Sequence, residues 1–245
     1  MDASESGRVS TKQQRIAKLA KQSPEMSLTS LAYHMDMEWM REAYRRTRKD
    51  GALGVDKVTA AEYEENLEEN LGSLLERAKA GSYKAPPVRR AYIPKGDNEY
   101  RPIGIPTLED KVMQKAVVML LEPIYEQDFL ECSYGFRPQR NAHQALESIW
   151  KNIMCMAEVW VLDVDIKNYF GTIKHQQLHE ILRHRVNDGV VRRLIGKWLK
   201  AGEAEEGNVS YPDEGTPQGG VISPLLSNIY LHEVLDGGCP VFWGI

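Results

Sequence analysis

The stretch that decides the fold is Val159-Trp-Val-Leu-Asp163-Val-Asp165-Ile-Lys-Asn-Tyr-Phe170, an apolar run that carries two carboxylates and ends in two aromatic rings. Val161, Asp163 and Asp165 follow a period of two, so both aspartates leave the same face of an extended segment. Mg²⁺ prefers carboxylate oxygens, keeps several waters and is often completed by substrate phosphates. The run therefore predicts a buried strand that ends at a metal site. The alternative is a strand that ends at solvent in an Asp turn.

Composition sets broad limits on the class of protein. A chain of 245 residues with 42% hydrophobic content can bury a substantial core in one large or two small domains. The net charge of −4 gives no indication of nucleic-acid binding for the chain as a whole. Glutamates gather in residues 62–76, whereas basic residues gather in 41–49 and 84–101. We therefore expect a locally basic surface on an acidic protein.

The cysteines and the apolar segments indicate the compartment. Cys132, Cys155 and Cys239 are odd in number and lack any C-x-x-C spacing, which argues against a disulfide framework and a zinc site. The first residues lack an apolar signal region, and nowhere do about 18 consecutive apolar residues occur. We expect a cytoplasmic, intracellular protein that neither spans nor binds a membrane.

Helix signals recur along the chain after a polar start. Residues 1–35 are expected to be a mobile extension with at most a short helix around Gln13 to Ala20. Capping residues and apolar stripes predict helices after Asp36, Thr59, Thr107 and Asn141, at about His175 to Val186 and Val190 to Ala201, and around Leu225. Pro123 is expected to end or kink the helix that contains it.

A hairpin is predicted between the second and third of these helices. Val88–Ile93 and Tyr100–Ile105 read as extended arms joined by a polar turn, which would present Lys95 and Arg101 near its tip. The mixed order of hairpin, helices and strand predicts an α+β fold, rich in helix, with an antiparallel β-hairpin.

Seven short blocks carry a resemblance to a known family. They are Gly54-Val-Asp56, Ile93-Pro-Lys95, Arg101-Pro-Ile-Gly-Ile-Pro106, Ser133-Tyr-Gly-Phe-Arg-Pro138, Asp165-Ile-Lys167, Gly215-Thr-Pro-Gln-Gly-Gly220 and Ser223-Pro-Leu-Leu-Ser-Asn228. Each block alone is a weak signal, but their common order is specific. From about Trp39 to Asp236 the chain resembles the reverse transcriptases encoded by group II introns. The resemblance implies right-hand polymerase fingers in residues 36–156 and an incomplete palm, with the short palm sheet, in residues 157–236.

The resemblance also implies roles for the matched polar residues. Asp165 matches the catalytic aspartate that binds the two Mg²⁺ ions of polymerases, with Ile166 adding a backbone carbonyl. Asp163 occupies an often acidic position that is not the principal ligand. Lys95 and Arg101 match the fingers residues that bind the incoming triphosphate, a role that suits a mobile ammonium and a rigid guanidinium fork. The alternative is two solvated cations on a hairpin.

Three further matches have structural alternatives. Phe170 matches the aromatic residue that excludes a ribose 2′-hydroxyl and so favours dNTPs, although it could equally be a core side chain. Gln218 matches a nucleotide contact, with Gly219 and Gly220 allowing close backbone approach, and the alternative is a simple turn. Arg137 is expected to touch the template backbone, with a structural cap as the competing role.

The sequence departs from the family pattern at two places. Asn168-Tyr-Phe-Gly171 replaces the usual glycine and aspartate around the aromatics, which is expected to change only the local turn. Beyond Asp236 the family continues to a Y-A-D-D hairpin, whereas residues 237–245 lack any resemblance, which we interpret as a truncation or frameshift. We therefore expect negligible polymerase activity from this chain alone, and poor solubility from an exposed palm edge.

Three functions remain in view. In the full-length family the reaction is RNA-templated DNA synthesis from dNTPs with Mg²⁺, and the implied partners are group II intron RNA and an RNA template with a DNA primer. The alternative is a non-catalytic, maturase-like fragment that binds intron RNA through the basic groups of residues 41–49 and 84–101. A nuclease that uses Asp163 and Asp165 is the third reading, and it lacks an evident general base.

Overall fold

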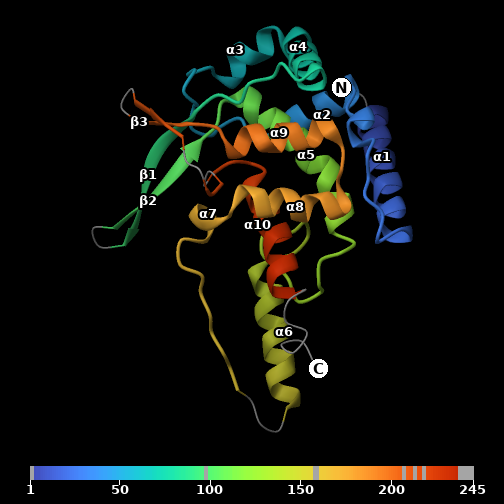
Figure 1. The fold of residues 1–245 in the computed structure, drawn as a ribbon, viewed down its shortest axis with the longest axis vertical. Coiled ribbons are helices and arrows are strands. Elements are labelled where there is room, and N and C mark those ends of the chain that lie inside the picture. The colour runs from blue at the N-terminus through green and yellow to red at the C-terminus, as the bar shows by residue number, and fades with distance from the viewer. Residues whose placement is uncertain are drawn as a thin grey trace.

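The computed structural model describes residues 3–96, 99–156, 160–205, 208–211, 214–216 and 219–236. The helices are α1 (Ala3–Gln22), α2 (Met37–Arg46), α3 (Ala60–Glu65), α4 (Leu67–Ala80), α5 (Leu108–Tyr125), α6 (Ala142–Cys155), α7 (Tyr169–Thr172), α8 (His175–Arg185), α9 (Gly189–Leu199) and α10 (Ser223–Leu231), with the 3₁₀ helix η1 (Leu31–His34) and the π-helical turn η2 (His232–Asp236). The strands are β1 (Val88–Gly96), β2 (Glu99–Ile105), β3 (Glu203–Glu205) and β4 (Asn208–Ser210). Figure 1 shows most of the helices gathered around α5, with α6 extending away below them and the strands along one side.

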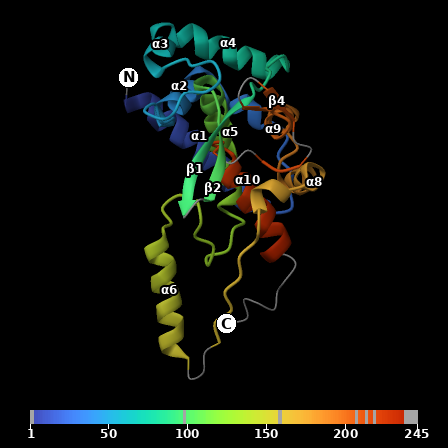
Figure 2. The ribbon, with the colours of Figure 1, turned by 90° about the vertical axis from the view of Figure 1, so that its left-hand side faces the viewer.

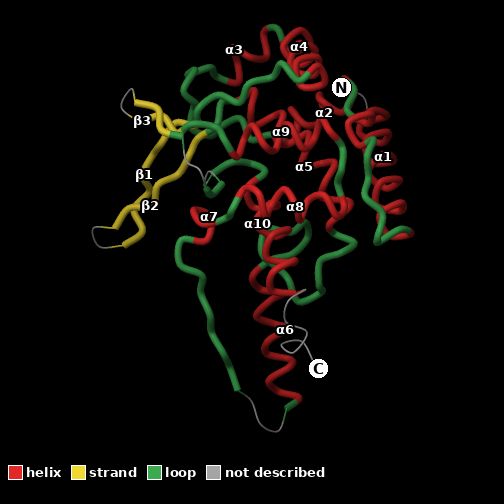
Figure 3. The backbone as a smooth tube through the Cα atoms, viewed as in Figure 1, coloured by secondary structure: helices red, strands yellow, loops and turns green. Residues whose placement is uncertain are grey.

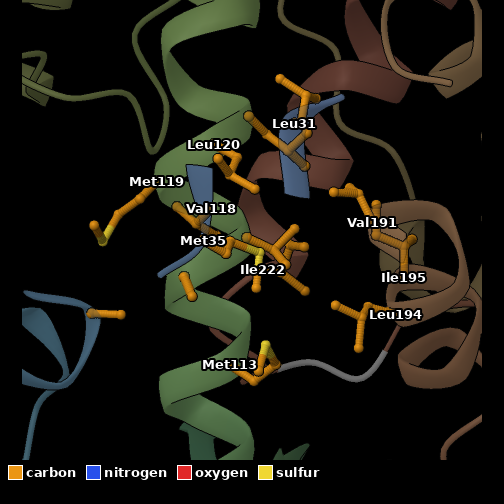
Figure 4. Close-up of a cluster of buried hydrophobic side chains, with 14 of the residues drawn as sticks. Leu31, Met35, Met113, Val118, Met119, Leu120, Val191, Leu194, Ile195 and Ile222 are labelled. Atoms are coloured by element: carbon orange, nitrogen blue, oxygen red, sulfur yellow. The ribbon is translucent and has the colours of Figure 1, made fainter. Parts of the chain in front are cut away.

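The core is built around α5, which is apolar on nearly every face and is therefore buried by its neighbours. The side chain of Thr107 caps it by accepting a 3.2 Å hydrogen bond from the backbone N–H of Asp110. In Figure 4 the side chain of Leu120 on α5 lies near Leu31 of η1, and that of Val118 lies near Ile222, with Val191, Leu194 and Ile195 of α9 to the right. Pro123 lies inside the last turn, and α5 ends two residues later at Tyr125.

The prediction of a mobile extension over residues 1–35 is wrong, because α1 is a 20-residue helix. Val9, Ile16 and Ala20 are buried, and the side-chain N–H of Gln13 donates a 3.0 Å hydrogen bond to the carbonyl of Met119 on α5. These apolar residues lie on one face at helical spacing. A narrow stripe therefore suffices to dock a mostly polar helix once α5 offers an apolar surface.

The local capping signals are confirmed. Asp36 accepts a 3.0 Å hydrogen bond from the backbone of Trp39 at the start of α2, and Asn141 opens α6 with a reciprocal capping box. Thr59 and Glu62 form the predicted box, but the helix that they open stops at Glu65 and a second helix starts at Leu67. Gly81 ends α4 in the left-handed conformation with φ of 82°, the usual glycine stop.

The sheet has the strand order β2-β1-β3-β4. β1 and β2 form the predicted antiparallel hairpin, in which Ile93 pairs with Arg101, and β1 runs parallel to β3. The hydroxyl of Tyr92 donates a 2.6 Å hydrogen bond to Glu205, and Arg90 lies 3.1 Å from the carboxylate of Glu203. These contacts tie the hairpin to the segment after α9. The helix-rich α+β class is confirmed.

The strand predicted from Val159 to Asp165 is not formed in its described part. Residues 160–166 are exposed, with Trp160 95% and Val164 72% accessible, and Figure 3 draws this stretch as loop. The described residues provide no paired neighbour for it, and an extended segment needs one to satisfy its backbone groups. Figure 2 shows α6 reaching away from the body, with the chain returning from its far end. Large apolar side chains are exposed on α6 and on residues 160–166, among them Trp150 and Trp160.

Among the described residues, no helix combines the length and the apolar character that crossing a membrane requires.

A buried polar network joins α5 to α9. The carboxylate of Asp110 accepts hydrogen bonds from the hydroxyl of Tyr83, from Nε1 of Trp198 at 2.7 Å and from Nε2 of Gln114 at 2.9 Å. Burial raises the pKa of Asp110 to about 6 from an ordinary value of 3.8, against the opposing effect of the three donors. The folded protein therefore binds a proton at Asp110 that the unfolded chain releases.

This network predicts a pH dependence of stability. Because the folded pKa of Asp110 is raised, its contribution to the free energy of unfolding is fully present below 3.8 and is lost as the pH rises through about 6. Between about pH 8 and about pH 5 the gain from this one group is about 1.4 kcal/mol. Urea unfolding of the wild type and of Asp110→Asn, each at both pH values, isolates this group from all others. An equal pH dependence in the two proteins would contradict the assignment.

Candidate nucleotide-binding site

A pocket of about 710 Å³ lies between the hairpin tip and the chain that leads into α7. It is lined from the hairpin by residues 95 and 99–102, from the other side by residues 164–170, and by Leu231 of α10. Five of the residues predicted from the sequence to form the site line it: Lys95, Arg101, Asp165, Ile166 and Phe170. They come from two segments, the hairpin and residues 165–170, which are more than 60 positions apart in the sequence.

The hairpin positions the two cations. Arg101 lies opposite Ile93 in the β1–β2 register, and an irregularity between Pro94 and Gly96 brings Lys95 to the tip. Both side chains are exposed. Within the described residues neither forms an ion pair with a carboxylate, so both charges are available to an anion in the pocket. Tyr100, 64% exposed, lines the pocket beside Arg101 and was not predicted. An aromatic residue next to a cation at a hairpin tip is the sequence signal that could have found it.

The opposite wall is held by α7 and the chain around Gly215. The backbone N–H of Thr216 donates a 2.8 Å hydrogen bond to the carbonyl of Phe170, and Tyr169 donates one of 2.8 Å from its hydroxyl to the carbonyl of Ser227. A side chain at Gly215, where φ is 91°, would begin 2.9 Å from the Phe170 carbonyl oxygen. Phe170 is half-buried and lines the pocket, so the alternative of an ordinary core side chain is not what the structure has.

Asn168 enters α7 with a left-handed φ of 51°, a conformation that asparagine tolerates better than most residues. A Cβ atom at Gly171 would lie only 2.7 Å from the side-chain amide of Asn168, which is too close for a side chain at this position. Gly171 therefore leaves room for the side chain of Asn168 in the turn that begins α7.

The two aspartates differ in their surroundings. Asp165 lines the pocket and is exposed, whereas Asp163 is exposed on the preceding segment and is not part of the lining. The described part of the chain contains no group of three or more His, Cys, Asp or Glu residues that could hold a metal ion. A cation at this pocket would therefore take Asp165 as its protein carboxylate and rely on substrate oxygens for others.

Two further predicted residues lie elsewhere. The guanidinium of Arg137 is buried, lies 3.0 Å from Glu126 and donates to the carbonyls of Leu130 at 2.6 Å and Ser133 at 2.8 Å. Of the two roles considered for Arg137 from the sequence, template contact and a structural cap, these contacts are those of a structural cap. Gln218 lies outside the described residues. Gly219, with φ of 108°, would place a Cβ 2.6 Å from the carbonyl oxygen of Gly104 on β2, so this glycine allows a close approach to the hairpin backbone, and its predicted approach to a nucleotide stays a prediction.

Comparison with known proteins identifies the family. Residues 93–237 match the family model of reverse transcriptase (RNA-dependent DNA polymerase). The chain is 38% identical over 232 residues to Protein YkfC of Escherichia coli K12, covering 92% of the chain and 61% of YkfC. It is 44% identical over 168 residues to the group II intron-encoded protein LtrA of Lactococcus lactis, covering 68% of the chain and 28% of LtrA. It thus spans less than two thirds of the length of these relatives.

The fold is also found in a solved structure. A chain of the partial Cas6-RT-Cas1–Cas2 complex matches with a TM-score of 0.53 and 21% identity, covering 86% of this chain and 35% of that one. This likeness concerns the fold alone. The family match spans the pocket from Lys95 to Phe170 and continues to α10. The chain therefore belongs to the reverse transcriptase (RNA-dependent DNA polymerase) family, and its sequence places it with the members encoded by group II introns.

Proposed function

We propose that this chain supplies the deoxynucleotide-binding part of a group II intron reverse transcriptase, which copies an RNA template, including its intron RNA, from a DNA primer. The observation that carries the proposal is the single pocket that gathers Lys95, Arg101, Asp165, Ile166 and Phe170. These residue types are the ones that a deoxynucleoside triphosphate requires: cations for the phosphates, a carboxylate for a metal ion, and a ring beside the sugar.

The triphosphate would lie against the hairpin. Lys95 provides a mobile ammonium, and Arg101 provides a planar fork that can donate two parallel hydrogen bonds to phosphate oxygens. Because the two side chains approach from one side and Asp165 from the other, the phosphates would lie between opposite charges. Such an arrangement needs a cation next to Asp165 to screen its repulsion from the phosphates.

Members of this family use a divalent metal ion, and we propose that it is Mg²⁺ here. The exposed carboxylate of Asp165 has no hydrogen bond or ion pair within the described residues, and the carbonyl of Ile166 is adjacent in the chain. Both are hard oxygen ligands of the kind that Mg²⁺ prefers. When bound, the metal neutralises phosphate charge and lowers the pKa of the attacking hydroxyl. Asp165 and Ile166 would hold it at the pocket wall.

Phe170 would select the sugar. Its backbone is held by the hydrogen bond from Thr216, so the position from which the ring projects depends on the contact of α7 with the chain around Gly215. A bulky ring fixed beside the sugar excludes a 2′-hydroxyl by steric clash and leaves a deoxyribose unhindered. The discrimination would therefore be repulsive, and it would depend on the backbone as much as on the ring.

Nucleotide binding tests this function, whereas primer extension tests the activity of this chain by itself. We expect the purified chain, with Mg²⁺, dNTPs and a primed RNA template, to extend the primer at a rate on the order of 10³-fold or more below that of an intact polymerase site. The reason is that the described pocket lining contains only the carboxylates Asp165 and Glu99, which lie on separate elements. The control is Asp165→Ala, which should differ little from the wild-type chain. Robust extension that D165A abolishes would overturn this expectation.

A further inference from the structure

A second and larger pocket, of about 1090 Å³, lies on α8 and α9, and it shares no lining residue with the nucleotide pocket. The stretch from Gly81 to Ala85 closes it on one side. Figure 1 shows α8 and α9 in the middle of the molecule, with the hairpin to the left. The charged and titratable residues that line it are Lys84, Lys174, His175, His179, Arg192, Arg193, Lys197, Lys200 and the single carboxylate Glu214. We name this surface the α8–α9 face.

The cations of the α8–α9 face are spread along α9 and are not clustered at one position. A neighbouring pocket of about 560 Å³ shares His179, Arg192 and Arg193 and adds Arg183. Along α9 the row runs from Arg192 to Lys200, which at 1.5 Å per residue is about 12 Å. A row of this length is longer than one phosphate group and matches a ligand that carries several negative charges in series.

Most of these charges have no carboxylate partner among the residues that the structure describes. Within the described ranges, Lys84, Lys174, Arg193 and Lys200 are exposed and form no ion pair with a carboxylate. Lys197 differs, because its ammonium donates a 2.6 Å hydrogen bond to the carbonyl of Gly81 and holds that segment in place. The face is thus a rigid surface with free cations around it.

The basic residues of α2 provide the contrast. Arg41 lies 2.7 Å from Glu68, and Arg45 and Arg46 both lie 2.6 Å from Glu42. The group at residues 41–49, which the sequence singled out for RNA binding, is therefore largely neutralised by its own carboxylates. A polyanion would have to compete with these ion pairs on α2, but not on the α8–α9 face.

Two groups in this face respond to the crowding of positive charge. Burial lowers the pKa of His179, and the charges of Arg192, His175, Lys200 and Arg183 lower it further. Nδ1 of His179 and Nε of Arg192 are buried and have no hydrogen-bond partner within the described residues. Glu180 and Glu214 are the carboxylates that line the two pockets, too few to balance the cations. A bound anion would relieve this repulsion.

We propose that the α8–α9 face binds the phosphodiester backbone of RNA at a site separate from the nucleotide pocket. Tyr83 in its lining is buried, and the other rings there are the partly buried imidazoles of His175 and His179, so the described lining offers no large exposed ring for base stacking. Cations without stacking rings contact phosphates and carry no sequence preference. The site would hold a stretch of RNA outside the polymerase cleft whether or not the chain synthesises DNA.

The test compares two pairs of exposed cations with equal charge. Arg193→Gln/Lys200→Gln removes two charges from the α8–α9 face, and Lys18→Gln/Lys21→Gln removes two exposed charges from α1. Binding of a labelled oligouridine of about 20 nucleotides, longer than most single-strand sites, is measured by fluorescence anisotropy over a range of salt concentrations. We expect R193Q/K200Q to reduce the slope of log affinity against log salt by about 1.4, or about 0.7 for each lost phosphate contact. The K18Q/K21Q protein should keep the wild-type slope.

Further arms make the result decisive. Glu214→Gln should tighten binding, because it removes a carboxylate that repels the backbone. The R193Q/K200Q protein should bind the Mg²⁺ complex of dTTP as the wild type does, because neither residue lines the nucleotide pocket, so that failure of the nucleotide site and failure of this face are distinguishable. Equal losses in R193Q/K200Q and K18Q/K21Q would show a general effect of net charge and overturn the proposal. Binding of inorganic phosphate that depends on Arg193 and Lys200, without binding of oligouridine, would also overturn it.

Discussion

Replacing Arg185 by alanine is expected to lower the free energy of unfolding by about 3–5 kcal/mol. The guanidinium is nearly buried and donates hydrogen bonds of 2.8 and 3.1 Å to the carboxylate of Asp128. It also donates to the carbonyl of Ala20 at 3.0 Å and to that of Ser23 at 2.9 Å, at the end of α1. Truncation leaves a carboxylate and several carbonyls without their donor, which costs more than the hydrogen bonds themselves contribute.

The matched control is Arg183→Ala, two residues earlier on the same helix. Its side chain is exposed, and we expect a change within about 0.5 kcal/mol. Arg185→Lys keeps the charge but loses the fork, so an intermediate loss is expected. Guanidinium unfolding followed by circular dichroism measures all three. Equal stability of R185A and R183A would contradict the claim that the hydrogen bonds of Arg185 stabilise the fold.

Local signals in the sequence were sufficient for most of the helices. The caps at Asp36, Thr59 and Asn141 depend on residues three positions away, and a cap can be read from the chain because its partner is close. The role of Arg185 could not be read, because its partners on α1 are more than 160 positions away. The sequence did not predict the docking of α1 for the same reason, because this docking depends on a surface that α5 provides.

The alternating pattern from Val161 to Asp165 shows the limit of periodicity. A period of two reports which side chains share a face, but a strand also needs a neighbour to bond with, and the described residues do not provide one. The sequence predicted which residues line the pocket, but it predicted the wrong secondary structure for the segment that carries Asp165. Lys95 and Arg101 are placed by a local hairpin, whereas Phe170 reaches the pocket through its contact with Thr216, which no local pattern reports.

Replacing Arg101 by glutamine is expected to weaken binding of the Mg²⁺ complex of dTTP by about 10- to 100-fold. One charge-assisted hydrogen-bonding group contributes about 1.5–3 kcal/mol, and each 1.4 kcal/mol is a factor of ten in affinity. Arg101 is exposed at the pocket and has no carboxylate partner within the described chain, so glutamine removes a phosphate ligand without disturbing an ion pair of the fold. Arg193→Gln is the matched control, since it is an exposed arginine on the α8–α9 face.

The most direct test of the nucleotide site is calorimetric titration of the wild type, R101Q and R193Q with dTTP and UTP in the presence of Mg²⁺. The pocket formed by the hairpin and residues 164–170 predicts that wild type and R193Q bind dTTP equally, that R101Q binds it at least about tenfold more weakly, and that UTP binds more weakly than dTTP because of Phe170. Equal dTTP affinity in all three proteins would contradict the assignment of this pocket as the nucleotide site.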